Sequence, residues 1–283
     1  MKHLVLGSEG QIGYELTRYL KSQGYNVLTF DIIANPRQDL RISENSELTS
    51  KIEECDFIHF LAFDVGGSRY LQTYQNSHKF ISNNVRLMEY TFELIKRYQK
   101  PFIFASSQMS SMSYSPYGVL KALGEYYTKS LNGIIVKFWN VYGLERDLEK
   151  AHVITDFILK ARSEKKIKML TDGTEQRQFL HAEDCSRCLI TLASRYTDVD
   201  HDKPLHVTSF EWVSILDIAK HVQNIHRDIE IIASEASDDV QKDARNEPDK
   251  YILKYWKPQI DLATGIHRID KELNEIIPIM ANK

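Results

Sequence analysis

The chain has 283 residues, which is room for one large α/β unit with an appended lobe or for two small domains. Lysine and arginine total 36 and aspartate and glutamate total 39, so the net charge of −3 offers no basic excess for nucleic-acid binding. Three cysteines cannot build a disulfide framework, the amino terminus lacks the apolar core of a signal peptide, and no stretch approaches the length of a membrane span. We therefore expect a soluble, cytoplasmic protein with no membrane or nucleic-acid partner and no metal site.

Apolar runs alternate with amphipathic segments over the first 140 residues. Strands are predicted at residues 3–7, 25–31, 56–62, 101–107 and 133–141, because short apolar runs are typical of buried parallel strands. Helices are predicted at 13–23, 74–98 and 114–131, where apolar residues recur at three- and four-residue steps. This alternation predicts an α/β fold, a Rossmann-type doubly wound parallel sheet with ligands at the carboxyl ends of its strands.

The pattern loosens from residue 144 onward. Further strands are predicted at 166–170, at 205–208 and near residue 230, and a helix is predicted across DCSRCLITLA. We expect residues 1–143 to form the cofactor-binding sheet domain, residues 178–210 to return to it, and residues 144–283 to supply mainly a smaller α/β substrate lobe.

A glycine turn, GSEGQIG, joins the first predicted strand to the first predicted helix. Such a turn brings backbone amides and a helix N-terminus close to a pyrophosphate, although glycines also serve ordinary tight turns. Asp31 follows Gly13 by 18 residues, where a carboxylate can bind both adenosine ribose hydroxyls and repel a 2′-phosphate. This favours NAD over NADP, with Arg37 leaving NADP as the alternative. The candidate cofactor-binding residues here are Gly7, Gly10, Gln11, Ile12, Gly13, Asp31, Asp39 and Leu40, the last two as an adenine contact or a solvated loop.

Ser107 ends the fourth predicted strand, and Tyr117 and Lys121 follow with the spacing YxxxK. Residues four apart share a helical face, so the Lys121 ammonium can lie beside the Tyr117 phenol. A neighbouring cation lowers the pKa of a phenol from about 10 and prepares it as a general base. Ser107, Tyr117 and Lys121 are therefore the candidate catalytic residues, while an exposed Tyr–Lys pair is the alternative for an isolated match.

These motifs resemble the extended short-chain dehydrogenases/reductases, the NAD-dependent nucleotide-sugar epimerases and dehydratases. The resemblance continues through HFLAFDVGG, FWNVYG, TDGTEQRQFLHAEDC and RNEPDKYILKYWKP. It implies that Leu61, Ala62, Tyr117 and Lys121 also contact the cofactor. It further implies a homodimer or homotetramer formed by the helices at 74–98 and 114–131, whose apolar stripes could instead pack inside one subunit.

The loop Val65-Gly66-Gly67 and the phrase AHVI look most like GDP-sugar members, such as GDP-fucose synthase and GDP-heptose 4-dehydrogenase. Arginines in two of the matching blocks would meet the diphosphate or nucleotide, unless they form surface salt bridges. The resulting candidate substrate-binding residues are Val65, Gly66, Gly67, Ser68, Gln108, Asn140, Val153, Arg177 and Arg245.

One departure from the family concerns the position after the serine. The dehydratases carry an Asp-Glu pair there and the 3,5-epimerases a cysteine nearby, whereas this chain has Gln108 and Met109. Neither side chain exchanges a proton near neutral pH, so we expect a site without a second acid/base group.

These observations favour an NAD-dependent oxidoreductase that acts by direct hydride transfer. Its expected substrate is a GDP-linked manno-hexose or heptose, and the reaction is expected at C4 of the sugar. The expected role is the synthesis of sugars for cell-surface polysaccharides. The alternatives are a nucleotide-sugar 4-epimerase and, from another class, a non-catalytic NAD-binding sensor or scaffold.

Overall fold

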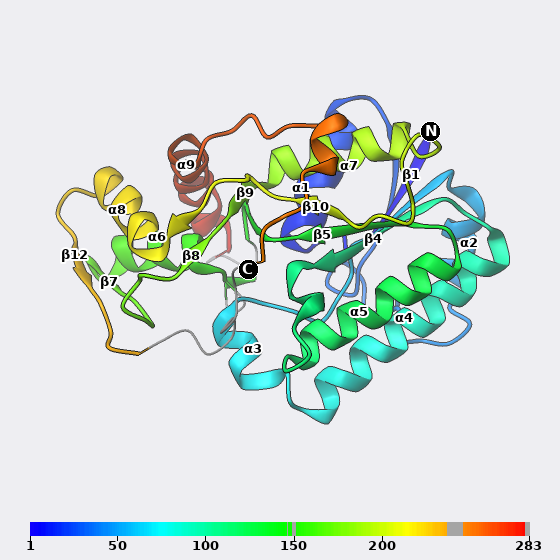
Figure 1. Ribbon diagram of the computed structural model, residues 1–283, viewed down its shortest axis with the longest axis horizontal. Helices are drawn as coiled ribbons and strands as arrows, with labels where there is room; N and C mark the ends of the chain where they lie inside the picture. Colours follow the sequence, from blue (N-terminus) through cyan, green and yellow to red (C-terminus); the bar gives the residue numbers. More distant parts are fainter. Residues whose placement is uncertain (146, 149–150, 237–245, 281–283) are drawn as a thin grey trace.

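Six parallel strands form the central sheet of the computed structural model, which describes residues 1–145, 147–148, 151–236 and 246–280 (Figure 1). Their order across the sheet is β2 (Asn26–Phe30), β1 (Lys2–Leu6), β3 (Phe57–Phe60), β4 (Phe102–Ser107), β5 (Ile134–Phe138) and β10 (Leu205–Val207). The predicted Rossmann-type sheet is confirmed. Its strand order reverses between β1 and β3, and in such sheets the ligand crevice opens at that point.

Helices cover both faces of the sheet. On one face lie α2 (Ser46–Glu54), α4 (His78–Tyr98) and α5 (Pro116–Ser130), and on the other lie α1 (Gln11–Ser22) and α7 (Ala182–Ser194). Leu4 and Phe104 pack toward the first layer, whereas their neighbours Val5 and Ile103 pack toward the second. Because successive residues of a strand face opposite sides, strands covered on both faces must be apolar throughout, as the predicted runs are.

A smaller lobe adjoins the carboxyl edge of the sheet. It contains three helices, α6 (Val153–Ser163), α8 (Ile215–Ile225) and α9 (Leu262–Met280), among the described residues. Three short strand pairs complete it, namely β6 (Asn140–Tyr142) with β9 (Phe179–His181), β7 (Lys166–Lys168) with β12 (Glu230–Ile232), and β8 (Gln176–Arg177) with β11 (Val213–Ser214). Tyr142, Phe157, Ile218 and Ile266 share its separate apolar core.

The helix predicted at 74–98 is wrong at its start. The structure has a short helix α3 (Ser68–Tyr74) and then α4, which begins at His78 because the Ser77 hydroxyl caps it by accepting from the Phe80 amide at 3.2 Å. In the same way Ser115 caps α5 by accepting from the Gly118 amide at 3.2 Å, so that helix begins at Pro116. Helix α2 has no counterpart among the predicted elements.

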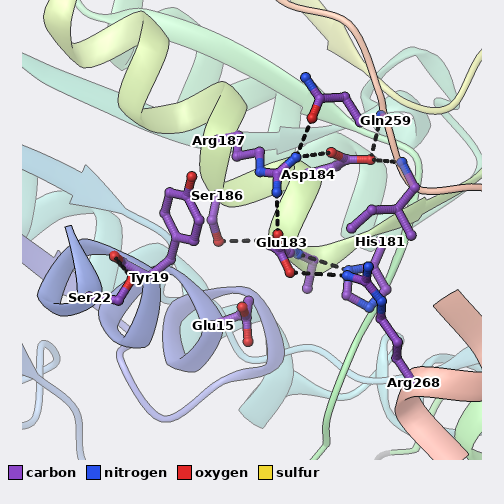
Figure 2. A network of polar contacts seen from close by, with 12 residues as sticks. Glu15, Tyr19, Ser22, His181, Glu183, Asp184, Ser186, Arg187, Gln259 and Arg268 are labelled. Carbon is purple, nitrogen blue, oxygen red and sulfur yellow. Dashed lines mark hydrogen bonds and ion pairs between the residues drawn. The ribbon is translucent and has the colours of Figure 1, made fainter.

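A polar network ties the small lobe to the helical layer formed by α1 and α7 (Figure 2). The buried carboxylate of Asp184 accepts from the backbone amides of Gln259 and Ile260 at 2.8 and 2.7 Å. Glu183 binds Arg187 on its own helix at 2.5 Å and Arg268 of α9 at 3.3 Å. The chain leading into α9 is thus held against the sheet domain by the Asp184 hydrogen bonds and by the Glu183–Arg268 pair.

Candidate active site

One cavity of about 630 Å³ opens at the carboxyl ends of the parallel strands. Its lining includes every glycine of the GSEGQIG turn, the ends of β2, β4 and β5, the residues directly after β3, and the first turns of α3 and α5. Residues far apart in the sequence meet here because parallel strands all end at the same edge. The predicted site residues that line it are Gly7, Gly10, Gln11, Ile12, Gly13, Asp31, Asp39, Leu40, Leu61, Ala62, Val65, Gly66, Gly67, Ser68, Ser107, Gln108, Tyr117, Lys121 and Asn140.

The glycine turn has no room for side chains at two positions. Gly7 has φ of +87°, and a Cβ there would lie 2.7 Å from Cα of Ala62. A Cβ on Gly13 would lie 2.0 Å from the carbonyl oxygen of Gly7. Helix α1 begins right after Gly10, which provides no side-chain cap, and the first amides of a helix have no partner within it. The turn is therefore a close-fitting cradle whose amides at Gly7, Glu9 and Gly10 hold its own fold, while the first amides of α1 are available to a dinucleotide pyrophosphate.

Asp31 lies directly after β2 and faces the same cavity. Its carboxylate accepts from the backbone amides of Glu9 at 2.9 Å and Ile33 at 2.8 Å, and its own amide donates to Gln38 at 2.9 Å. Arg37 is exposed and is not among the cavity-lining residues. Asp31 therefore faces the cavity at this end and Arg37 does not, while the lining guanidinium of Arg41 is paired with Asp39. A carboxylate at the position of Asp31 suits an unphosphorylated ribose.

Asp39 is held by an arginine that the sequence analysis did not single out. Arg41 forms a bidentate pair with it at 2.8 Å and also donates to Oδ1 of Asn83 at 3.0 Å. Burial opposes ionisation, but the hydrogen bonds and charge of Arg41 outweigh it and hold the pKa of Asp39 below its ordinary value. Asn83 in turn donates to Asp64 at 3.0 Å, and Asp64 accepts from Tyr70 of α3 at 2.6 Å. A continuous polar chain thus runs along the cavity wall from the expected adenine end to the loop before α3.

The three candidate catalytic residues come together at the end of β4 and the start of α5. Ser107 is the last residue of β4, and Tyr117 and Lys121 lie on successive turns of α5. The side chains of Tyr117 and Ser107 are hydrogen-bonded, and the Lys121 amine donates to the carbonyl oxygen of Ala105 at 2.5 Å. All three are buried, with at most 9% of each exposed, so bulk water is largely kept from the reacting groups.

Burial dominates the acidity of both ionisable members of this group. It raises the pKa of Tyr117 to about 12, against the opposing effect of the Ser107 hydrogen bond. It lowers the pKa of Lys121 to about 7, against the opposing charge of Glu125. The expected lowering of the Tyr117 pKa by Lys121 is not seen in this arrangement, where the amine donates to the backbone carbonyl of Ala105 and lies 5.8 Å from the centroid of the Tyr117 ring.

Two predicted substrate-binding residues lie away from the cavity lining. Arg177 of β8 is buried and donates to the carbonyl oxygen of Gln176 at 2.7 Å. Val153 begins α6, immediately after the lining residue His152. Arg245 lies outside the described residues.

The sequence analysis missed an acid/base pair in this cavity. His152 Nδ1 lies 2.6 Å from Oε1 of Glu145, and the His152 amide donates to Oε2 of the same carboxylate at 3.0 Å. Burial alone would lower the pKa of His152, but the charge and hydrogen bond of Glu145 raise it. The position after Ser107 is occupied by Gln108 and Met109, and the Glu145–His152 pair adds ionisable groups elsewhere in the cavity wall that the sequence analysis did not identify. The sequence feature that could have indicated the pair is His152 in the phrase AHVI, which the sequence analysis used only for the resemblance to GDP-sugar enzymes.

The described residues contain neither a group of metal ligands nor a membrane-spanning helix. Across residues 1–145, 147–148, 151–236 and 246–280, no three His, Cys, Asp or Glu side chains are grouped as a metal site would require. Within those same ranges no helix is both long and apolar enough to cross a bilayer.

The cysteines Cys185 and Cys188 are buried in α7, and His181 caps that helix by accepting from the Glu183 amide at 3.2 Å.

The arrangement is typical of a Rossmann-type enzyme with a nucleotide cofactor, because the glycine cradle, Asp31 and the buried Ser–Tyr–Lys group line one cavity. Residues 3–207 match the model of the NAD dependent epimerase/dehydratase family. The chain belongs to this family, which confirms the resemblance drawn from the motifs, and its cofactor is NAD.

Individual relatives share modest identity with the chain. It is similar to GDP-mannose 3,5-epimerase 1 of Oryza sativa subsp. indica, with 25% identity over 312 residues, which cover 93% of this chain and 79% of that protein. It is 30% identical to GDP-L-fucose synthase of Sinorhizobium fredii over 138 residues, 45% of this chain and 42% of that protein. Among solved structures, a GDP-6-OMe-4-keto-L-xylo-heptose reductase from C. jejuni aligns with a TM-score of 0.83 at 16% identity, over 97% of this chain and 98% of that one. At 16% identity this structural similarity shows a shared fold and nothing about the substrate.

Proposed function

We propose that the protein is an oxidoreductase that transfers hydride between NAD and C4 of the sugar in a nucleotide sugar. The observation that carries this proposal is the buried Ser107–Tyr117–Lys121 group in the same cavity as the glycine cradle. In the oxidising direction Tyr117 accepts the proton of the C4 hydroxyl and Ser107 orients that hydroxyl. The proposed role of Lys121 is to stabilise the phenolate, which requires its amine to turn from the Ala105 carbonyl toward Tyr117 when cofactor and substrate bind. NAD supplies the acceptor for the hydride that leaves C4.

We further propose that the nucleotide is GDP and the sugar a manno-configured hexose or heptose. Support comes from the Val65–Gly67 loop in the cavity wall and from the similarity to the GDP-mannose and GDP-fucose enzymes. Such an activity belongs in the cytoplasm, where nucleotide sugars for cell-surface polysaccharides are made. Arg177 and Arg245 remain the proposed contacts of the diphosphate or nucleotide, and Val153 a proposed substrate contact, although Arg177 and Val153 are not among the cavity-lining residues.

The test is a panel of GDP- and UDP-sugars incubated with the enzyme and NAD. A dehydrogenase raises the absorbance at 340 nm with its sugar, and the product carries a C4 ketone by mass spectrometry. A 4-epimerase changes the sugar without net NADH, and a sensor or scaffold changes neither. Recovery of NADP instead of NAD from the purified protein would overturn the role given to Asp31.

A second candidate function is proton exchange at a ring carbon next to a C4 ketone, as in 3,5-epimerisation. The observation that favours it is the Glu145–His152 pair in the cavity wall, together with the similarity to GDP-mannose 3,5-epimerase. A C4 ketone acidifies the neighbouring C–H bonds, and His152 can supply or remove a proton there. Incubation in D₂O separates the two functions, because C4 oxidoreduction alone leaves C3 and C5 without deuterium.

We also propose a homodimer built through α4 and α5. Ile81 and Val85 of α4 are 39% and 36% exposed, and Val119, Leu123 and Tyr126 of α5 are 49%, 38% and 74% exposed. These stripes do not pack fully inside one subunit. Two adjacent helices with exposed apolar residues suit a contact between identical copies. Light scattering of the wild type and of Leu123→Glu would test this, since the charged variant should be monomeric.

A further inference from the structure

Phe63 touches both ionisable members of the catalytic group. It is the third residue after β3, and its ring lines the cavity. The Lys121 amine lies 3.8 Å from the centroid of the Phe63 ring. The rings of Phe63 and Tyr117 meet edge to face, with centroids 5.7 Å apart and planes at 79°.

Lys121 has few other partners for its charge. Its amine is buried, donates to the Ala105 carbonyl, and lies 5.3 Å from the ring centroid of Phe104. Among the described residues, no carboxylate lies within 4.0 Å of it. Glu125, the one carboxylate that shifts its acidity, binds Ser106 and lies 3.2 Å from the Lys137 amine.

We propose that Phe63 is a positioning residue, whose ring face holds the Lys121 ammonium and whose edge-to-face contact with Tyr117 sets the spacing of the two side chains. The electron-rich face of an aromatic ring attracts a cation, and the attraction strengthens when the cation is removed from water. The burial that lowers the pKa of Lys121 makes the ammonium depend on such a partner. This inference rests on the proposed roles of Tyr117 and Lys121.

Phe63→Leu is the informative variant, because leucine keeps the site apolar but has no ring face. With the ring gone and water still excluded, Lys121 should lose its proton at a pH about one unit lower. Phe63→Tyr is the matched control, because it keeps the ring, and its titration should follow the wild type. Phe63→Met replaces the leucine variant if that one does not fold, which its melting temperature will show.

The first readout is independent of turnover. Protein labelled with ¹³C-lysine is titrated by NMR, and the Lys121 signal is assigned by its disappearance in Lys121→Arg. A lower midpoint in Phe63→Leu than in the wild type and Phe63→Tyr supports the proposal. Equal midpoints in the leucine variant and the wild type, or equal shifts in the leucine and tyrosine variants, overturn it.

The second readout is the pH dependence of kcat with the nucleotide sugar. In Phe63→Leu the fall of kcat at alkaline pH should move to lower pH by the same amount as the NMR midpoint, and in Phe63→Tyr it should not move. An unmoved kcat profile beside a shifted NMR midpoint would overturn the positioning role. If the wild type converts no nucleotide sugar, the proposed function fails while the NMR titration still decides whether Phe63 holds the ammonium.

Discussion

His152 Nδ1 lies 2.6 Å from Oε1 of Glu145, and both side chains line the cavity that contains Tyr117. Replacing the carboxylate by an amide in Glu145→Gln removes the charge that raises the His152 pKa and leaves the burial that lowers it. The midpoint of the His152 imidazole signals, followed by NMR, should therefore fall by roughly one unit or more. A midpoint that stays at the wild-type value would show that the pair is not formed in solution.

Tyr117→Phe should keep cofactor binding and lose turnover. The substitution removes only the phenol oxygen, so the ring still packs beside Phe63. Loss of a general acid/base group costs about 10²–10⁴-fold in rate. Product formation by chromatography measures the rate, and calorimetric titration with NAD is the control. Turnover equal to that of the wild type would remove Tyr117 from the mechanism.

Asp31→Asn should weaken NAD binding and loosen the glycine turn together. The carboxylate accepts from the Glu9 and Ile33 amides and is the proposed ribose contact, and a hydrogen bond to a charged group is worth about 1.5–3 kcal/mol. The dissociation constant for NAD should rise by about 10- to 100-fold, while that for NADP rises less or falls. Parallel titrations with both cofactors measure the ratio, and an equal loss for both would contradict a selective role.

Gly13→Ala tests the cradle without adding polarity. The new Cβ would lie 2.0 Å from the Gly7 carbonyl oxygen, so the turn must move. Overpacking of this kind costs about 1–3 kcal/mol, and NAD binding should drop with the melting temperature. Gly24→Ala offers a control for stability alone, because nothing lies within 4 Å of a Cβ there, although its φ of +79° adds local strain. Full NAD affinity in Gly13→Ala would argue against the cradle.

The paired strands β1 and β3 contain two buried histidines, which predict a loss of stability in mild acid. His3 Nδ1 lies 3.0 Å from His59 Nε2, and burial lowers the pKa of His3 to about 4 and that of His59 well below its usual value. Below pH about 6.5 these two histidines are protonated in the unfolded chain but stay neutral in the folded protein. The free energy of unfolding therefore decreases as the pH falls from about 6.5 toward 4. The slope is at most about 1.4 kcal/mol per pH unit for each histidine.

Urea unfolding at pH 7.0 and 5.5, values chosen about the ordinary histidine pKa of about 6.5, measures this loss. The double variant His3→Asn/His59→Asn should show a smaller difference between the two pH values, whatever its absolute stability. An equal free energy of unfolding at both values in the wild type would contradict the prediction.

The alternation of strands and helices, the glycine turn and the YxxxK spacing were readable from the sequence because each is a local pattern. Strand burial shows in short apolar runs, and a helix turn sets which residues share a face. The helix starts at His78 and Pro116 were mispredicted, because a single serine hydroxyl decides a cap and leaves no periodic signal. Phe63 went unnoticed for a related reason, since its partners Tyr117 and Lys121 are distant in the sequence. Arg41 is close in sequence to its partner Asp39, but its bond to Asn83 and its place in the cavity wall depend on the fold.

The sequence by itself thus determined the sheet, and it singled out the glycine turn and the Ser–Tyr–Lys group, whose residues line one cavity in the structure. These features depend on spacing within one βα unit or on a known motif. Only the tertiary structure decided which acids and bases share the cavity. In the structure His152 and Glu145 line the cavity that contains Tyr117, whereas Arg177 is not among its lining residues. The ring of Phe63 lies against the Lys121 amine. The reason is physical: contacts between separate loops, and the burial that shifts a pKa, depend on how the elements pack together.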